Sequence, residues 1–396
     1  MSDPVLTFFA QGLLNLSLLQ KAVVLLVMVQ VTIASVTIYL HRHQAHRGLD
    51  IHPVVSHFFR FWLWLSTGMV TGEWVAVHRK HHAKCETEED PHSPQVEGIR
   101  KLMLDGVSLY RREAANPETL RRYGHGTPND WLECRIYAGH PAAGIALLLV
   151  LDVVLFGAAG VAMWAVQMMW IPFWAAGVIN GLAHWWGYRN YETRDASTNL
   201  WPLALWIGGE ELHNNHHAFS SSAKFSSKWW EFDIGWFYIR VLAAMGLARV
   251  KKVAPKPTIE PGKERIDMDT LRAVVGARMH VTAEYGRKVV LPVLRQVRAD
   301  TAGWSARKLK TLLVREQSMM DERERAQLQS VLQSSEELQT VYTFRLRLQE
   351  IWSRASASHD SLMAALREWC AQAEATGIHA LQDFARSLRG FSLQSA

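Results

Sequence analysis

Cysteine is scarce in this sequence, and neither sign of charge dominates it. The 396 residues include three cysteines, Cys85, Cys134 and Cys370, and no CxxC pair joins them. This scarcity excludes a disulfide framework and gives no indication of a thiolate metal knuckle, so we expect the chain to face a reducing compartment. Lys and Arg number 43 against 37 Asp and Glu, a net charge of +6. An excess this small suits lipid headgroups or coenzyme phosphates as well as nucleic acid, and we predict no nucleic-acid partner.

A disorder-promoting composition is also lacking. Hydrophobic residues make up 49% of the chain, and it contains 17 tryptophans, which excludes a disordered or fibrous protein. A chain of 396 residues is too long for one small core. We therefore expect at least two structural parts.

Long uncharged runs predict membrane-spanning helices. Residues 22–40 carry no charge and are long enough to cross about 30 Å of hydrocarbon. Residues 141–184 suit two further spans, joined by a tight turn near Gly157 to Gly160. Residues 4–20 are also uncharged but shorter and more polar, so they either span or lie in the interface. The N-terminus lacks a basic region and a cleavage site, so we expect the first apolar stretch to be retained.

Basic residues and prolines divide the rest of the chain. Residues 83–140 are rich in arginine, which the positive-inside rule places in the cytoplasm. Residues 251–261 contain three prolines and are expected to be a linker. Residues 261–396 show apolar residues at helical spacing and predict three or four amphipathic helices, with breaks near Gly303, 356–360 and Gly377. The fold class we predict is all-α: a membrane bundle of three or four spanning helices with a cytosolic cap, in a domain 1–255, followed by a helical domain 261–396.

Nine of the 18 histidines fall into four short groups. HxxHH occurs twice, and positions i, i+3 and i+4 of a helix share one face. In an α-helix, His41 and His46 would lie about 140° apart, a spacing that suits two neighbouring ions better than one. A single histidine such as His184 in an apolar span is ordinarily a hydrogen-bonded core residue. The clustered imidazoles instead indicate a shared cation. The nine clustered histidines are His41, His46, His78, His81, His82, His184, His213, His216 and His217.

The short connections between these groups predict that all four lie on one membrane side. The 32 residues from His46 to His78 are too few for an out-and-back pair of spans, so residues 51–71 are expected to form an amphipathic helix in the interface. Residues 82–184 have room for one hairpin, which returns the chain to the same side. We therefore expect the histidines to meet on the cytoplasmic face of the membrane.

Nine nitrogen ligands exceed the needs of one ion. A structural zinc site uses four ligands, commonly with thiolates, whereas two ions with open positions suit oxygen chemistry. Iron is redox-active and zinc is not, so we predict a di-iron centre.

Four motifs resemble the membrane fatty-acyl desaturases, particularly the bacterial-type Δ9 acyl-CoA and acyl-lipid enzymes. They are HRHQAHR, EWVAVHRKHHAKCETEEDPH, NGLAHWWGYR and GGEELHNNHHAF, and the resemblance covers roughly residues 20–250. It implies an integral membrane oxidoreductase with a non-haem di-iron centre. Such an enzyme uses O2 and two electrons to place a cis double bond in a long saturated acyl chain, carried on coenzyme A or a phospholipid.

The resemblance also implies the ligands. One iron would take His41, His78, His82 and His216, with Asn180 acting through a water. The other would take His46, His81, His184, His213 and His217. His43 has no counterpart role, and the remaining histidines are expected to be ordinary surface or core residues: His52, His57, His92, His125, His140, His280, His359 and His379.

The residues that would contact the substrate, the electron carrier and the role of the helical tail each have more than one interpretation. Trp74, Trp185, Trp186 and Phe219 would wall an acyl tunnel or form an interfacial aromatic belt. Arg79, Lys80, Lys84, Arg189 and Arg194 would hold a headgroup or anchor the chain at the membrane. The electrons are expected to come from a separate carrier, which is ferredoxin-like, a flavoprotein or a cytochrome. The helical tail would dock that donor, self-associate or stabilise the membrane surface.

Two other functions are alternatives to a desaturase. A related hydroxylase would use similar histidine boxes. A membrane metal transporter would place ionisable residues along a pathway inside the spans. The histidines of this sequence lie at span ends and in cytosolic segments, which argues against transport.

Overall fold

The computed structural model describes residues 4–297, 305–353 and 358–393, and these residues are mostly helical. They divide into two compact units, each described separately below. The first unit contains residues 1–189 and 195–253, and the second contains residues 190–194 and 254–396.

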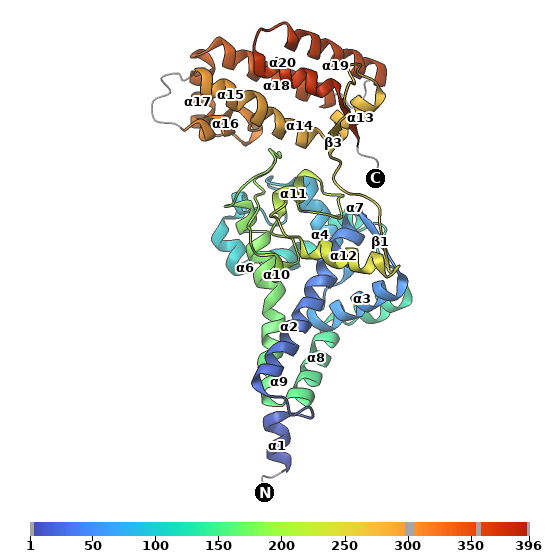
Figure 1. Ribbon diagram of the computed structural model, residues 1–396. Coiled ribbons are helices and arrows are strands. Elements are labelled where there is room, and N and C mark those ends of the chain that lie inside the picture. The colour runs from blue at the N-terminus through green and yellow to red at the C-terminus, as the bar shows by residue number, and fades with distance from the viewer. Residues whose placement is uncertain (1–3, 298–304, 354–357, 394–396) are drawn as a thin grey trace. The chain divides into compact units, whose positions relative to one another are not determined.

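The first unit is built on apolar helices that run side by side (Figure 1). Its helices and strands are α1 (Pro4–Gln11), α2 (Leu18–Ala34), the π-helix Ser35–Ala45, β1 (Leu49–Ile51), α3 (Pro53–Thr67), α4 (Thr71–Lys84), α5 (Pro94–Glu97), α6 (Ile99–Ala114), α7 (Pro117–Tyr123), the π-helix Glu133–Tyr137, α8 (Pro141–Phe156), α9 (Ala158–Ile171), the π-helix Pro172–Ile179, the 3-10 turn Leu182–His184, α10 (Ala204–Ile207), α11 (His213–Ala218), α12 (Ile234–Ala244) and β2 (Ala248–Val250).

The first candidate span begins at a capping box. Ser17 accepts a hydrogen bond from the Gln20 N–H, and the Gln20 side chain accepts one from the Ser17 N–H, which satisfies two free helix-terminal donors. The chain stays helical through Ala45, and Leu18–Ala45 is long and apolar enough to cross a membrane. The predicted span 22–40 lies within this helix. Val23, Leu26 and Val27 are more than half exposed, as expected of a surface that faces lipid.

The predicted hairpin is confirmed. The α8 and α9 helices meet at Gly157, whose φ of 68° is a left-handed conformation that favours glycine. A side chain at Gly160 would come within 2.0 Å of the Asp152 carbonyl oxygen, so the two helices approach closely there. Ala158–His184 is the second stretch long and apolar enough to cross a membrane, whereas α8 and α12 are apolar but shorter. A count of three or four spans stays a prediction.

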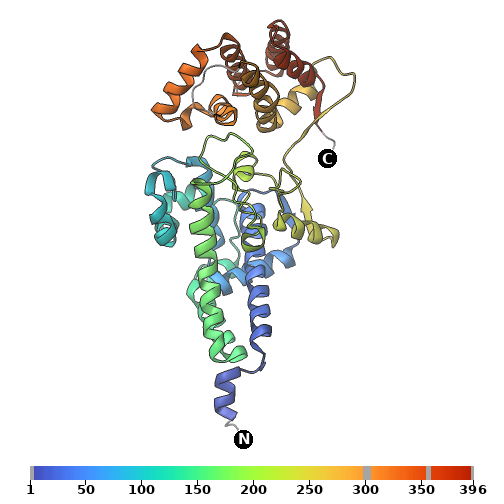
Figure 2. The ribbon, with the colours of Figure 1, turned by 60° about the vertical axis from the view of Figure 1, so that its left-hand side comes forward.

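The helix expected over residues 51–71 is α3, which covers Pro53–Thr67. Val54, Phe58 and Phe61 are exposed on it, and its interfacial placement stays a prediction. Arg60 is buried, however, and its guanidinium donates to Asp130 and Glu133 at 2.7 to 3.2 Å. Figure 2 shows α1, in dark blue, at one end of the apolar helices. The π-helix Ser35–Ala45 continues α2 and packs against α4. A short antiparallel pair, β1 with β2, brings residues 49–51 beside residues 248–250 near the C-terminal end of this unit.

The second unit is a separate helical bundle with its own core. Its elements are β3 (Pro257–Ile259), α13 (Met268–Gly276), α14 (Arg278–Tyr285), the π-helix Gly286–Val290, α15 (Leu291–Val297), α16 (Ala306–Val314), the 3-10 turn Gln317–Met319, α17 (Glu322–Gln333), α18 (Glu336–Ser353), α19 (His359–Glu374), α20 (His379–Arg389) and β4 (Phe391–Leu393). Tyr285, Phe384 and Trp369 pack edge to face in its centre.

Two predictions for this part of the chain need correction. Its described residues hold eight α-helices, α13 to α20, where the apolar spacing predicted three or four. Polar caps such as Asp267, Asp321 and Ser358 begin new helices within runs that keep the apolar period. The expected linker is also partly ordered, because β3 pairs antiparallel with β4. The break at Gly377 is confirmed between α19 and α20, while the break at Gly303 lies outside the described residues.

Residues 190–194 belong to the second unit although they lie far from it in sequence. Tyr191 is 4% exposed, and its hydroxyl is 3.1 Å from Nδ1 of His280. The two rings pack edge to face, with centroids 5.1 Å apart. The loop that follows His184 is therefore part of this unit's packing.

Candidate metal centre

Five imidazoles form a first histidine group, which comprises His41, His46, His78, His82 and His216. Their ligand nitrogens all lie within 4.8 Å of one another. Nε2 of His216 is 3.0 Å from Nε2 of His41 and 2.9 Å from Nε2 of His82. Nε2 of His46 is 2.8 Å from Nε2 of His78. The nitrogens of three separate segments thus converge on one small volume.

A π-helix brings His41 and His46 together. The His46 N–H donates to the His41 carbonyl at 3.0 Å, which is the i to i+5 bond that defines a π turn. Residues five apart then lie on nearly the same face, and the ring centroids are 4.9 Å apart. The α-helical spacing predicted that the two residues would reach different ions. The structure instead places both in the first group.

A second histidine group lies beside the first and comprises His81, His184, His217 and Cys85. Nε2 of His213 adjoins it, at 2.9 Å from Nε2 of His184 and 3.2 Å from Nε2 of His217. The ring centroids of His82 and His217 are only 4.4 Å apart, so the two groups are immediate neighbours. The position of Cys85 among the histidines was not predicted from the sequence.

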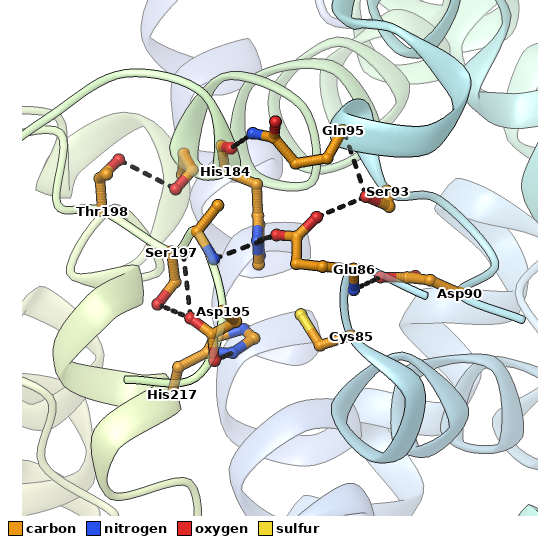
Figure 3. Close-up of polar contacts among 12 residues, drawn as sticks. Cys85, Glu86, Asp90, Ser93, Gln95, His184, Asp195, Ser197, Thr198 and His217 are labelled. Carbon is orange, nitrogen blue, oxygen red and sulfur yellow. Dashed lines mark hydrogen bonds and ion pairs between the residues drawn. The ribbon is translucent and has the colours of Figure 1, made fainter. Parts of the chain in front are cut away.

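Four of the imidazoles have their Nδ1 atom paired with a carboxylate. In the second group, Nδ1 of His81, His184 and His217 faces Asp90, Glu86 and Asp195 at 2.9, 2.9 and 3.1 Å, respectively. Figure 3 shows Glu86 between His184 and Ser93, and Asp195 beside His217. In the first group, Nδ1 of His41 faces Glu210 at 2.6 Å. Such carboxylates fix the tautomer and the orientation of metal-binding imidazoles.

These carboxylates were not predicted from the sequence. Glu86 and Asp90 lie four and eight residues after HRKHH, and Glu210 lies three residues before HNNHH, so their closeness to the boxes was an available signal. Asp195 had no such signal. His92, expected to be ordinary, is buried and stacks on His81 with centroids 4.4 Å apart.

The hydrogen-bonding chemistry of the rings fits a bound cation. Because Nδ1 of His184 and of His217 donates to a carboxylate, Nε2 of each ring carries a lone pair and no proton. Nε2 of His213 faces both lone pairs, and a single N–H can satisfy only one of them. A cation among these nitrogens satisfies all three, so the residues present are suited to hold metal.

Burial keeps most of these imidazoles neutral. Burial first, and neighbouring imidazoles second, lower the pKa of His78, His82 and His216 well below the ordinary value. For His217, burial outweighs the opposing charge of Asp195 and lowers the pKa to about 4. His81 differs, because burial lowers its pKa but the carboxylates of Asp90, Glu86 and Asp195 together raise it above the ordinary value. Burial also raises the pKa of the Cys85 thiol well above its usual range.

The metal-free chain is expected to lose stability as the pH falls from 6.5 toward 4. In this window the unfolded chain protonates His217 while the folded chain does not, so acid favours unfolding. One pKa unit corresponds to about 1.4 kcal/mol, so His217 alone contributes about 2 kcal/mol between pH 6.5 and about pH 5. His81 acts in the opposite direction, because its folded-state pKa is raised. Thermal unfolding in detergent at several pH values measures the sum, and equal stability across the window would contradict the expectation.

Removing the charge of Glu86 is expected to weaken metal binding by the second group. Glu86→Gln leaves the side chain's shape but loses the carboxylate that faces His184. Loss of such an orienting partner commonly costs about 10- to 100-fold in metal affinity. Competition between the protein and a coloured chelator for Zn²⁺ measures the change. Glu89→Gln is the matched control, because Glu89 is exposed and pairs only with Lys84 in the described structure, and equal affinities of the two variants would refute the role of Glu86.

The predicted substrate residues lie around the centre but differ in their surroundings. Trp74 stacks on His78 with an interplanar angle of 12° and centroids 4.8 Å apart. Arg79 donates to the backbone carbonyls of four residues, and Lys80 pairs with Glu113. Arg189 donates to the carbonyls of Asp195 and Ser197. These three cations are thus engaged within the protein.

The remaining predicted site residues lie at the edge of the centre. Trp185 and Trp186 are 52% and 68% exposed. Asn180 is half-buried at the end of the π-helix Pro172–Ile179. In the described parts of the chain, no direct hydrogen bond joins the Asn180 side chain to the histidines, and its action through a water stays a prediction.

Comparison with known proteins gives matches in two parts of the chain. A family model described as fatty acid desaturase matches residues 19–233. The Delta-9 acyl-lipid desaturase 1 of Arabidopsis thaliana is 31% identical over 220 residues, which are 54% of this chain and 69% of the relative. An acyl-CoA 5-desaturase of Anemone leveillei is 32% identical over 55% of this chain and 67% of its own length. A second family model, described as transposase, matches residues 272–392.

Proposed function

The chain belongs to the fatty acid desaturase family, and from this premise we propose that it uses two iron ions and O2 to place a cis double bond, at the Δ9 position, in a long saturated acyl chain. The acyl group is carried on coenzyme A or on a phospholipid. The convergence of nine imidazoles into two adjoining groups supports this proposal most directly. The chain is an oxidoreductase, and its active site is proposed to face the cytoplasm from the inner membrane.

The bound iron ions would supply the activation of O2 that an unreactive C–H bond requires. The residues of this chain would bind the ions, orient the ligands and exclude water. The first group would hold one ion, and His81, His184, His213 and His217 would hold the other. The four carboxylates fix which nitrogen of their four partner rings faces inward, so these ligands would need little reorganisation. Trp74 covers one side of the first group and helps to exclude water.

The acyl chain is proposed to approach along the aromatic residues beside the centre. Trp74, Trp185 and Trp186 are the candidates to contact it. Because Arg79, Lys80 and Arg189 are engaged within the protein, a headgroup role for them would require these contacts to open. A separate ferredoxin-like protein, flavoprotein or cytochrome is proposed to deliver the electrons.

The second unit is proposed to support this enzyme rather than to act on DNA. Among the described residues, the groups that could hold a metal all lie in the first unit, which supports this proposal.

Metal analysis combined with lipid profiling tests the proposal. The full chain and a His217→Ala variant are expressed in a host rich in saturated acyl chains, and the fatty acids are separated by gas chromatography with mass spectrometry. We expect two iron ions per purified chain and a new monounsaturated acyl chain, which the variant fails to produce. A hydroxylated product would identify a hydroxylase instead. One zinc ion per chain with unchanged lipids would overturn the proposal.

A further inference from the structure

The thiol of Cys85 faces the second histidine group. Its Sγ lies 3.8 Å from Nε2 of His81 and within 4.8 Å of ligand atoms of His184 and His217. Figure 3 shows the sulfur pointing toward the space between His184 and His217. Cys134 is exposed, and Cys370 is buried in the second unit. Cys85 alone among the three cysteines adjoins the histidines.

The backbone holds this orientation at a conformational cost. Cys85 ends α4, and the next residue, Glu86, has a φ of 62°. A left-handed conformation is unfavourable for glutamate, and such strain is concentrated at functional sites. The Glu86 N–H donates to Asp90 at 2.9 Å, and its carboxylate accepts from His184. The turn therefore presents the Cys85 thiol and the Glu86 carboxylate to the same group of imidazoles.

The donor atoms around this thiol have the arrangement of a metal's ligands. His81, His184 and His217 each have Nδ1 held by a carboxylate, so their Nε2 lone pairs face inward. A nitrogen at about 2.1 Å and a sulfur at about 2.3 Å from one ion are at most about 4.4 Å apart. The 3.8 Å between Sγ of Cys85 and Nε2 of His81 lies within this limit. The thiol is thus close enough to share an ion with the imidazoles.

We propose that Cys85 is a metal ligand, with its sulfur bound to the ion that His81, His184 and His217 hold. The inference rests on the metal centre of the proposed function and goes beyond it. On binding, the thiol releases one proton to solvent and one sulfur–metal bond forms, with no change in the oxidation state of either atom. The two ions then differ chemically, because the first group offers five nitrogens and no sulfur. A thiolate donates more electron density than an imidazole and favours softer metals.

The test uses Co²⁺ as the probe in the purified full chain. A thiolate bound to Co²⁺ produces a sulfur-to-metal charge-transfer absorption in the near ultraviolet, which imidazole ligands do not produce. We expect this absorption, with two ions per chain, in the unaltered chain and in the matched control Cys134→Ser. In Cys85→Ser it should fall to the level of the metal-free protein. X-ray absorption of the unaltered Zn²⁺-loaded chain, which needs no variant, should show one sulfur at about 2.3 Å for every two ions.

The outcomes separate this inference from the proposed function. Two bound ions without the absorption, or an absorption that persists in Cys85→Ser, would overturn the role of Cys85 and leave the desaturase proposal intact. A chain that binds no metal would overturn both. If Cys85→Ser fails to fold, the X-ray absorption of the unaltered chain still decides the question.

Discussion

A chain with His216→Ala is expected to form no unsaturated product and to lose metal from the first histidine group. His216 is fully buried on α11, and its Nε2 lies between Nε2 of His41 and Nε2 of His82. Alanine removes this shared contact and leaves the other two rings facing a void. Loss of a group that orients a metal ligand commonly lowers metal affinity or activity about 10- to 100-fold. Loss of the ligand itself should therefore lower the product yield more than about 100-fold. Product yield and metal content per chain measure the two effects.

His125→Ala provides the control for this prediction. His125 is exposed in the same unit, and in the described structure its ring contacts only the Arg122 carbonyl. This variant should keep both metal and product. If His216→Ala retained two ions per chain and normal product, the first group would not be part of the catalytic centre.

Replacing Arg42 by methionine is expected to destabilise the first unit by about 3–5 kcal/mol, because removal of one partner leaves a buried charge unpaired. The Arg42 guanidinium is fully buried, and it donates to both carboxylate oxygens of Asp233 at 2.9 and 3.3 Å. It also donates to the Ala223 and Gly208 carbonyls, and it lies 3.8 Å from the Phe225 ring centroid. Phe225 in turn packs against His41 and His216. The variant should therefore unfold at lower temperature and bind metal poorly.

Arg249→Met is the matched control for Arg42. Arg249 also pairs with an aspartate, Asp50 at 2.9 Å, but its side chain is 80% exposed. Exposed pairs contribute about 0–1 kcal/mol, so thermal unfolding in detergent should change little. Equal destabilisation by the two substitutions would contradict the proposed role of the Arg42–Asp233 pair.

The sequence predicted the meeting of the histidines because their spacing and the short connections between them restrict the topology. It also predicted the turn at Gly157, since two long apolar runs need a tight connection there. The π-helix over Ser35–Ala45 could not be predicted in this way, because an apolar period does not distinguish α from π winding. With this π turn, His46 lies in the first group beside His41, whereas the family resemblance assigns it to the other iron.

The carboxylates and Cys85 were harder to predict for another reason. Asp195 reaches His217 across 22 residues, and Glu86 reaches His184 across 98. The closeness of Glu86 to a histidine box marks it as a candidate, but which imidazole each carboxylate faces depends on the tertiary arrangement of the loops. A single cysteine likewise gives no ligand signal until its neighbours are known. The short helices of the second unit were missed because polar caps interrupt a nearly continuous apolar period.

The loop at 190–194 means that no single cut separates the two units. A chain shortened after Val253 would keep all nine histidines but would deprive Tyr191 of His280, the ring on which it packs. Conversely, grafting residues 254–396 onto another protein would leave His280 without the Tyr191 ring that packs against it. Any exchange of the second unit between proteins must therefore carry this loop with it.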